Sequence, residues 1–472
     1  MGLIDMSFLR ISRCLLALVF LTACETTTSG ALKPIVAPVT TQTALRPARI
    51  PQYERYKTTI KTPLRDLQVD AGFTLVDDWS SFMRYHDEHV KGREGYDEKQ
   101  LGFYSDRIDV SQCASDLGRT DTKASSKEPG QNLPSLVNRC HNMLAQLFRI
   151  DPAVNVSHYR QIIDYWLENG VLLRANSIQA RQGREGADYA YALSSNLAKM
   201  MAHFALYHPL YDYSNDEMAD VIEMFERFSA SYNYYRPFQE QGQYFAELCN
   251  LSRPTVPTGT NDHCGSFNTR MAVGATLFGL EFGSQLVFDK GIQHTEIMLA
   301  TFDEHKMYTS QIWRRDALSY ADQIGPAIDQ LDYALEKAFG IDFANMQTVH
   351  GVTPGEVYQH MWTVANNPAL LKPYMNYKRR NDPHYYSNVP DYGGANMFSV
   401  ISRIESGELA PTYVWQAFNE RRYILTVPGL AREFQPELWR KWKSRMDVFD
   451  FDFGQRITGF SPLILREATG RY

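Results

Sequence analysis

The chain has 472 residues, 44% hydrophobic and 22% charged, so it is long enough to bury a large core or to form two domains. Its formal net charge of -6 argues against nonspecific binding to nucleic acid. The sequence holds no Walker loop and no Gly-x-Gly-x-x-Gly turn between a strand and a helix, which argues against a nucleotide cofactor.

Residues 1–24 have the pattern of a secretory signal peptide. Arg10 and Arg13 precede the apolar run "CLLALVFL", which is too short to span a membrane, and "LTAC" follows it. The ending resembles the bacterial lipoprotein signal, which implies that Cys24 carries the lipid; a plain signal peptide with a coincidental cysteine is the alternative. Because Glu25 and not Asp follows Cys24, we expect a periplasmic protein held by its lipid at the outer membrane.

The segment 25–55 follows this signal and is rich in Thr, Pro and Ala, without any hydrophobic period. Such a composition predicts a flexible tether. We therefore expect the folded protein to begin near residue 56.

Four cysteines remain once Cys14 is removed with the signal and Cys24 is lipidated: Cys113, Cys140, Cys249 and Cys264. An even number in an oxidising compartment predicts disulfides, with three possible connectivities. Pairing of neighbours, Cys113 with Cys140 and Cys249 with Cys264, is the simplest. A zinc site is the rival interpretation, but the sequence has no Cys-x-x-Cys pair, and we expect no metal.

From about residue 135 onward, apolar residues recur at three- and four-residue spacing, which predicts helices. The predicted helices cover 136–148, 159–173, 191–207, 216–232, 271–288 and 320–339. Breaker segments separate several of them, and no run of alternating β-branched residues has comparable weight. The sequence thus predicts an all-α protein of antiparallel helical hairpins, with an (α/α) toroid, or incomplete α/α barrel, over 56–390. Residues 391–472 are predicted to form a helical and loop extension packed on it.

The stretch "PTGTNDHCGSFNTRMAVGATLFG" contains a first group of candidate site residues. Asn261, Asp262 and His263 come at or just before the start of a long apolar helix. An Asn or Asp there caps the free amides, and the same helix terminus attracts anions. A cap explains one polar residue but not His263, which is therefore a candidate base.

A second group lies about fifty residues downstream, in "QIWRRDALSYADQIG". Arg314 and Arg315 are followed by Tyr320 at the head of another apolar helix. A solvated basic turn and an amphipathic tyrosine at a helix edge are the alternative interpretation.

In this order and at this spacing, the two groups resemble the alginate lyase family of polysaccharide lyases, whose fold is an (α/α) toroid. Asn261 and His263 fall on the Asn-Asn-His run of that family, and "ALSY" at 317–320 falls on its Ala-Leu-x-Tyr segment. The chain departs from the pattern at Asp262, Asp316 and Gln323.

The resemblance implies β-elimination on a uronic-acid-containing, alginate-like polysaccharide. Asn261 and Arg315 would neutralise the substrate carboxylate, and His263 or Tyr320 would take the C5 proton, with Tyr320 returning one to the leaving oxygen. No cofactor is required. Candidate substrate-binding residues are Arg314, Asn196 and His203.

Two other functions stay open at this point. A glycoside hydrolase on the same toroid would use paired carboxylates such as Asp303 with Glu304 or Asp329 with Asp332. A noncatalytic polysaccharide-binding lipoprotein of an exopolysaccharide export system would explain the departures from the family pattern. The run "HDEH" at 86–89 lacks the spacing of a metalloprotease motif and is typical of a solvated helix face.

Overall fold

The computed structural model describes residues 62–89, 137, 152–172, 184–231, 266–308, 324–348, 350–372, 397–410 and 433. The chain divides into the units Met1–Thr41 and Gln42–Tyr472, and every described residue belongs to the second. The signal peptide, the whole predicted tether and all six cysteines lie outside the described residues, and these interpretations stay predictions.

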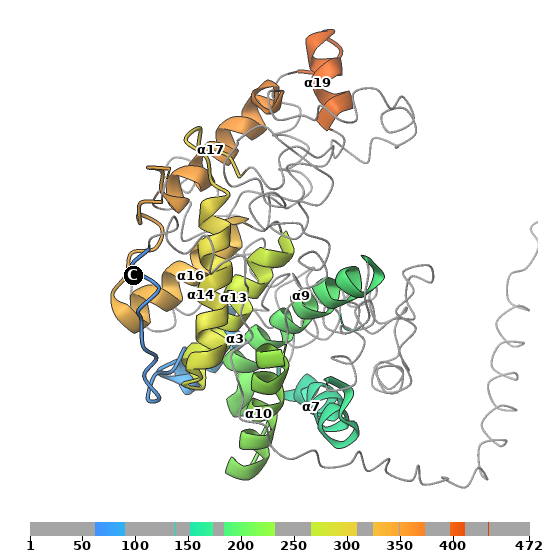
Figure 1. The fold of residues 1–472 in the computed structure, drawn as a ribbon, viewed down its shortest axis with the longest axis vertical. Coiled ribbons are helices and arrows are strands. Elements are labelled where there is room, and N and C mark those ends of the chain that lie inside the picture. Colours follow the sequence, from blue (N-terminus) through green and yellow to red (C-terminus); the bar gives the residue numbers. More distant parts are fainter. Residues whose placement is uncertain are drawn as a thin grey trace, which may run out of the picture. The chain divides into compact units, whose positions relative to one another are not determined.

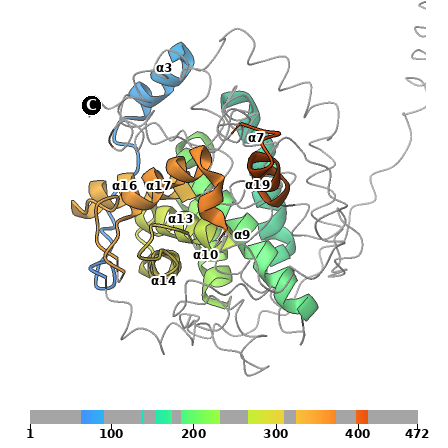
Figure 2. The same cartoon turned by 90° about the horizontal axis from the view of Figure 1, so that it is seen from above.

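The regular structure of the described residues is helical, with no β-strand and one isolated bridge between Phe302 and Tyr308. The predicted all-α class is confirmed for this part of the chain. No helix in it is long and apolar enough to cross a membrane. Figures 1 and 2 show the helices α3 (Trp79–His89), α7 (Pro152–Asn169), α9 (Arg184–Tyr207), α10 (Asn215–Ser231), α13 (Ser266–Glu281), α14 (Gln285–Ala300), α16 (Ile324–Phe339), α17 (Pro354–Asn366) and α19 (Met397–Glu405). Short 3-10 turns η1 (His208–Leu210) and η3 (Pro368–Leu371) follow α9 and α17.

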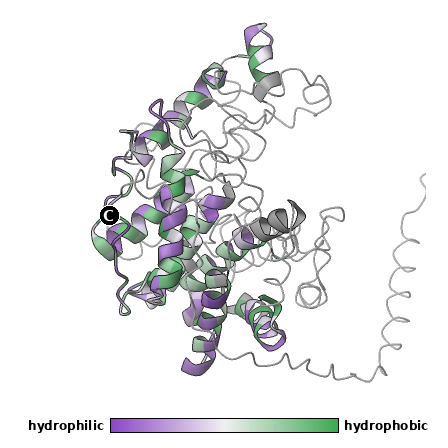
Figure 3. Ribbon diagram, in the orientation of Figure 1, coloured by the Kyte–Doolittle hydropathy of each residue, from purple (hydrophilic) through white to green (hydrophobic). Residues whose placement is uncertain are grey.

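The helices predicted at 159–173, 191–207, 216–232 and 320–339 correspond to α7, α9, α10 and α16. Hydrophilic and hydrophobic residues are mixed along α10 and α16 in Figure 3, as expected of helices with one buried face. Only Val137 of the predicted helix at 136–148 is described, and it is helical and buried.

The single helix predicted over 271–288 is wrong, because the chain turns back within it. Gly283 has a φ of +62°, which glycine adopts without strain, and the amide of Ser284 donates to the carbonyl of Gly279 at 2.9 Å. The helix α13 therefore ends at Glu281 and α14 begins at Gln285.

The helices α13 and α14 form an antiparallel hairpin in place of the single predicted helix. Gly279 lies against the backbone of Phe288, and Gly291 lies against that of Thr276, so residue numbers run in opposite directions along the contact. A Cβ at either glycine would overlap the facing backbone. This close approach explains why the hairpin contains glycines at positions where a helix would otherwise disfavour them.

The helices α9 and α13 also pack against each other, but they run in the same direction. Arg270 near the start of α13 donates to Ser195 at 3.3 Å, and Phe282 just after its end lies 5.5 Å from Phe204, between ring centroids. Because residue numbers rise together along the contact, α9 and α13 pack in parallel. α10 likewise contacts α14. The closure of these hairpins into a toroid stays a prediction.

Residues Thr62–Asp77, which we name the N-terminal strap, precede α3 and bind several later helices. Thr62 Oγ1 donates to Glu296 on α14 at 2.5 Å, and the amide of Val69 donates to Gln285 at 2.9 Å. The strap thus runs beside the α13–α14 hairpin. Within the predicted C-terminal extension, α19 contacts η3; the domain boundaries themselves stay predictions.

Candidate active site

The late parts of α9, α13 and α16 meet around one residue of the N-terminal strap. Glu281, the last residue of α13, accepts a hydrogen bond from the amide of Leu75 at 2.5 Å, and its other oxygen lies 2.8 Å from His208 Nε2, just after α9. On α16, Tyr333 Oη donates to the carbonyl of Leu75 at 2.8 Å. We name this group of Leu75, His208, Glu281 and Tyr333 the closed end.

We expect the starts of α13 and α16 to lie on the side away from the closed end. Both helices have 16 residues, which makes each roughly 24 Å long at 1.5 Å per residue. They contact each other, and both reach the closed end with later residues, Glu281 on α13 and Tyr333 on α16. We name the region where they begin, at Ser266 and Ile324, the start end.

A side-chain contact fixes a further piece of chain at the start end. Tyr308 Oη lies 3.1 Å from Thr269 Oγ1, which is in the first turn of α13, and both groups are buried. The next described residue is Ile324, the first of α16. The described chain therefore reaches the first turn of α13 at Tyr308 and resumes at the first residue of α16.

The residues predicted to be catalytic flank these helix starts. Asn261 and His263 precede Ser266 by five and three residues, and Arg314, Arg315 and Tyr320 lie between Tyr308 and Ile324. All five lie outside the described residues, so their roles stay predictions. The expected helix start after His263 is confirmed by α13.

The structure places the predicted binding residue Asn196 beside the start end. It is 4% exposed and follows Ser195, which accepts a hydrogen bond from Arg270 at 3.3 Å. Lys199, one helical turn further along α9, is 3% exposed. Sequence analysis did not single out Arg270 or Lys199, because one basic residue on an apolar helix carries no spacing signal of its own.

His203, the other described binding candidate, lies deeper in the core. It is 0% exposed, and its ring stacks on that of Tyr159 with 4.3 Å between centroids. Burial lowers the pKa of His203 from 6.5 to about 3, so its ring is neutral at neutral pH. It follows Asn196 by seven residues, roughly 10 Å along the helix toward the closed end. The structure therefore does not place His203 and Asn196 at the same height along α9. A binding role for His203 stays a prediction.

A buried polar pair holds the first turn of α13 on α14. Asn268 Nδ2 donates to the carbonyl of His294 at 2.9 Å, and Asn268 Oδ1 lies 2.7 Å from His294 Nδ1. Burial, and then the neighbouring Lys290, lower the pKa of His294 well below its usual value. Burial also lowers the pKa of Lys290 to about 7. The start of α13 is thus fixed by side chains that stay largely uncharged.

One carboxylate of each pair proposed for a hydrolase, Asp303 and Asp332, is engaged in local structure. Asp303 Oδ1 accepts hydrogen bonds from the amides of His305 at 3.0 Å and Met307 at 2.8 Å. Asp332 Oδ1 accepts one from the amide of Ala344 at 2.9 Å. These bonds shape the turns after α14 and α16, so nothing in this geometry favours the glycoside hydrolase.

The run "HDEH" at 86–89 forms the end of α3, which confirms the predicted helix, but its side chains are not described. Among the side chains that are described, no three His, Cys, Asp or Glu residues gather in a metal-binding arrangement.

The chain has a weak likeness to a solved structure. No family model matches the chain, and no curated protein matches its sequence. Among solved structures, the chain is similar to a variant of alginate lyase A1-III complexed with a tetrasaccharide, with a TM-score of 0.38 and 14% identity over 74% of this chain and 92% of that one. A TM-score of this size does not establish a common fold.

Proposed function

We propose that this chain is a polysaccharide lyase that cleaves a uronic-acid-containing polysaccharide by β-elimination. The observation that carries the proposal is the contact between Tyr308 and Thr269, together with the shared closed end of α13 and α16. These contacts support one location for two groups of residues that lie about fifty positions apart in the sequence. The residue pattern of each group supports the chemistry.

Chain length supports this convergence as well. A fully extended chain spans at most about 3.6 Å per residue, so His263 lies within roughly 11 Å of Ser266 and Tyr320 within roughly 14 Å of Ile324, between Cα atoms. Both distances are short compared with the helices themselves. The two side chains are therefore proposed to face one sugar at the start end.

In the proposed reaction, Asn261 and Arg315 hold and neutralise the carboxylate of the uronic acid, which stabilises the enolate-like transition state. His263 or Tyr320 removes the proton at C5. The bond between C4 and the glycosidic oxygen breaks, a C4–C5 double bond forms, and Tyr320 returns a proton to the leaving oxygen. These residues act without a cofactor.

Because both the polymer and the protein carry net negative charge, the binding site needs a locally positive electrostatic potential. The N-terminus of α13 supplies a partial positive charge, and Arg270 lies four residues after it on the same helix. Arg314 and Asn196 are proposed to bind the neighbouring part of the polymer. We also propose that Cys24 anchors the enzyme by lipid at the periplasmic side of the outer membrane.

The test is the release of unsaturated uronides, which absorb ultraviolet light, from a panel of polyuronates by the purified full-length protein. His263→Ala should lower the rate by about 10²–10⁴ without loss of folding, because it removes one proton transfer. The matched control His305→Ala changes a histidine side chain that is 67% exposed and should leave the rate unchanged. If the parent releases no unsaturated product but binds the polymers, the noncatalytic binding lipoprotein is the correct function.

A further inference from the structure

A cleft separate from the start end lies between α7 and α10. Its volume is about 400 Å³, within the range of small-ligand sites. It is lined by Trp166, Leu167, Glu168, Gly170, Leu172, Asp220, Glu223, Met224, Arg227 and Phe228. The two helices contact each other, so the cleft is part of the packed protein.

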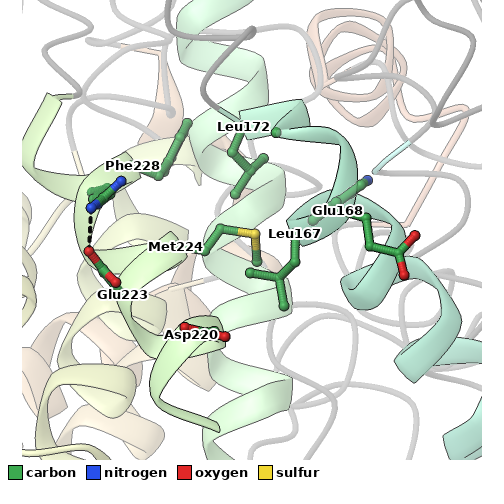
Figure 4. A pocket seen from close by; sticks show the side chains of 10 residues that line it. Leu167, Glu168, Leu172, Asp220, Glu223, Met224 and Phe228 are labelled. Carbon is green, nitrogen blue, oxygen red and sulfur yellow. Dashed lines mark ion pairs between the residues drawn. The ribbon is translucent and has the colours of Figure 1, made fainter. Parts of the chain in front are cut away.

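The floor of the cleft is apolar. Figure 4 shows Leu167, Leu172 and Met224 pointing toward one another in its centre, with Phe228 beside them. Leu172 and Phe228 are 1% and 2% exposed, so this floor is well packed. It offers a surface for an alkyl or aromatic group and gives a polar polymer few hydrogen-bond partners.

The margin of the cleft is acidic. Figure 4 places Glu168 on one side, Glu223 on the opposite side and Asp220 between them. Glu223 pairs with Arg227 at 2.5 Å, four residues on. Within the described part of the chain, Glu168 and Asp220 have no hydrogen bond and no ion pair. Three carboxylates and one guanidinium leave a formal charge of -2 on the lining.

The backbone adds to this negative potential. α7 ends at Asn169, and Gly170, with a φ of +57°, lines the cleft just after it. A helix C-terminus carries a partial negative charge that a basic residue usually offsets. The last turn of α7 contains Glu168 and no basic side chain. The charge at this end of α7 thus attracts a cation.

We propose that this cleft binds an organic cation with an apolar stem, that is, an alkylammonium group. The stem would lie on Leu167, Leu172 and Met224, and the ammonium would lie between Glu168 and Asp220 near the C-terminus of α7. A polyuronate does not fit this site, because its carboxylates would meet the acidic margin. The site is therefore independent of the proposed lyase reaction.

The test is calorimetric titration of the full-length protein with hexylammonium chloride, using 1-hexanol and sodium hexanoate as probes of the same stem. Hexylammonium should bind at least tenfold more tightly than hexanol, and hexanoate should not bind. Equal affinities for hexylammonium and hexanol would overturn the proposal, as would the absence of binding at millimolar concentrations. Tighter binding of glucosamine than of hexylammonium would also overturn it, because glucosamine has the charge without the apolar stem.

Variants test which charges are responsible. Glu168→Gln and Asp220→Asn should each weaken hexylammonium binding roughly two- to fivefold, the size expected of an exposed ion pair. Arg227→Gln should strengthen it, because a competing cation is removed. Asp216→Asn, on the same helix but outside the cleft lining, is the control and should have no effect. An equal effect of Asp216→Asn and Asp220→Asn would contradict the site.

Discussion

The closed end and the start end of the same helices use their polar side chains differently. At the closed end, Glu281, Tyr333 and His208 bind one another or the backbone of Leu75, and their hydrogen bonds hold four separate segments together. At the start end, the described contacts fix the helix starts and the chain at Tyr308, next to the predicted catalytic residues. The difference teaches that the closed end joins segments from distant parts of the sequence, whereas the start end, among the described residues, holds the helix starts and is where the reaction is proposed to take place.

The largest expected effect comes from the same substitution made at the two ends. Tyr320→Phe should lower the rate of uronide release by about 10²–10⁴, because only a proton-transferring hydroxyl is lost. Tyr333→Phe removes the hydroxyl that binds Leu75 and should cost about 1 kcal/mol of unfolding free energy with an unchanged rate. Rate assays and urea unfolding measure both. If Tyr333→Phe lowers the rate and Tyr320→Phe does not, the assignment of the two ends is reversed.

The next effect concerns the junction at the closed end. Glu281→Ala removes the acceptor of the Leu75 amide and the partner of His208, and leaves a part-buried donor without its bond. We expect a loss of about 2–3 kcal/mol in unfolding free energy. If Glu281→Ala has the same unfolding free energy in urea as the parent but releases uronides more slowly, the contrast between the two ends is wrong.

The pH dependence of stability tests the burial of His203. Its pKa is about 3 in the folded protein and 6.5 in the unfolded chain, so below pH 6.5 the unfolded chain binds a proton that the folded protein does not. Stability from this group is complete above pH 6.5 and is lost as the pH falls toward 3. The loss should be about 2 kcal/mol at pH 5. His203→Gln should reduce the difference between the unfolding free energies measured in urea at pH 7 and pH 5. An unchanged difference would mean that burial does not lower the pKa of His203.

The smallest effect distinguishes the two residues of α9. Asn196→Ala should raise the KM for the polyuronate roughly five- to tenfold, as expected for the loss of about one hydrogen bond, with little change in kcat. His203→Gln at pH 7 should leave KM unchanged, because its ring is buried nearer the closed end. An increase of KM in both variants would extend the binding region along the whole of α9.

The sequence predicted the helices whose buried faces follow a clear period. α16 has apolar residues at helical spacing and ends before Gly340, whose φ of +67° suits a helix end, and its existence was therefore predictable. The turn at Gly283 was not, because apolar residues recur on both sides of the Gly283–Ser284 pair, as at Leu280, Phe282, Leu286 and Val287.

The sequence gives no comparable signal for α14 or for the N-terminal strap. Lys290, His294 and Glu296 are all buried on α14, so this helix has no polar stripe that would mark it as amphipathic. The strap binds through backbone amides and carbonyls to side chains more than 200 residues away, as between Leu75 and Glu281. Of the candidate site, the helix starts were predicted from local pattern, while the closeness of α13 and α16 depends on these distant contacts.

The N-terminal strap also sets an order for folding. Leu75 leaves the ribosome 206 residues before Glu281 and 258 residues before Tyr333, the two side chains that satisfy its backbone. At about 5–20 residues per second, the strap waits roughly 10–40 s for the first of these partners. Loop closure over such separations slows folding, so we expect the strap, the first described segment to be synthesised, to be among the last to dock.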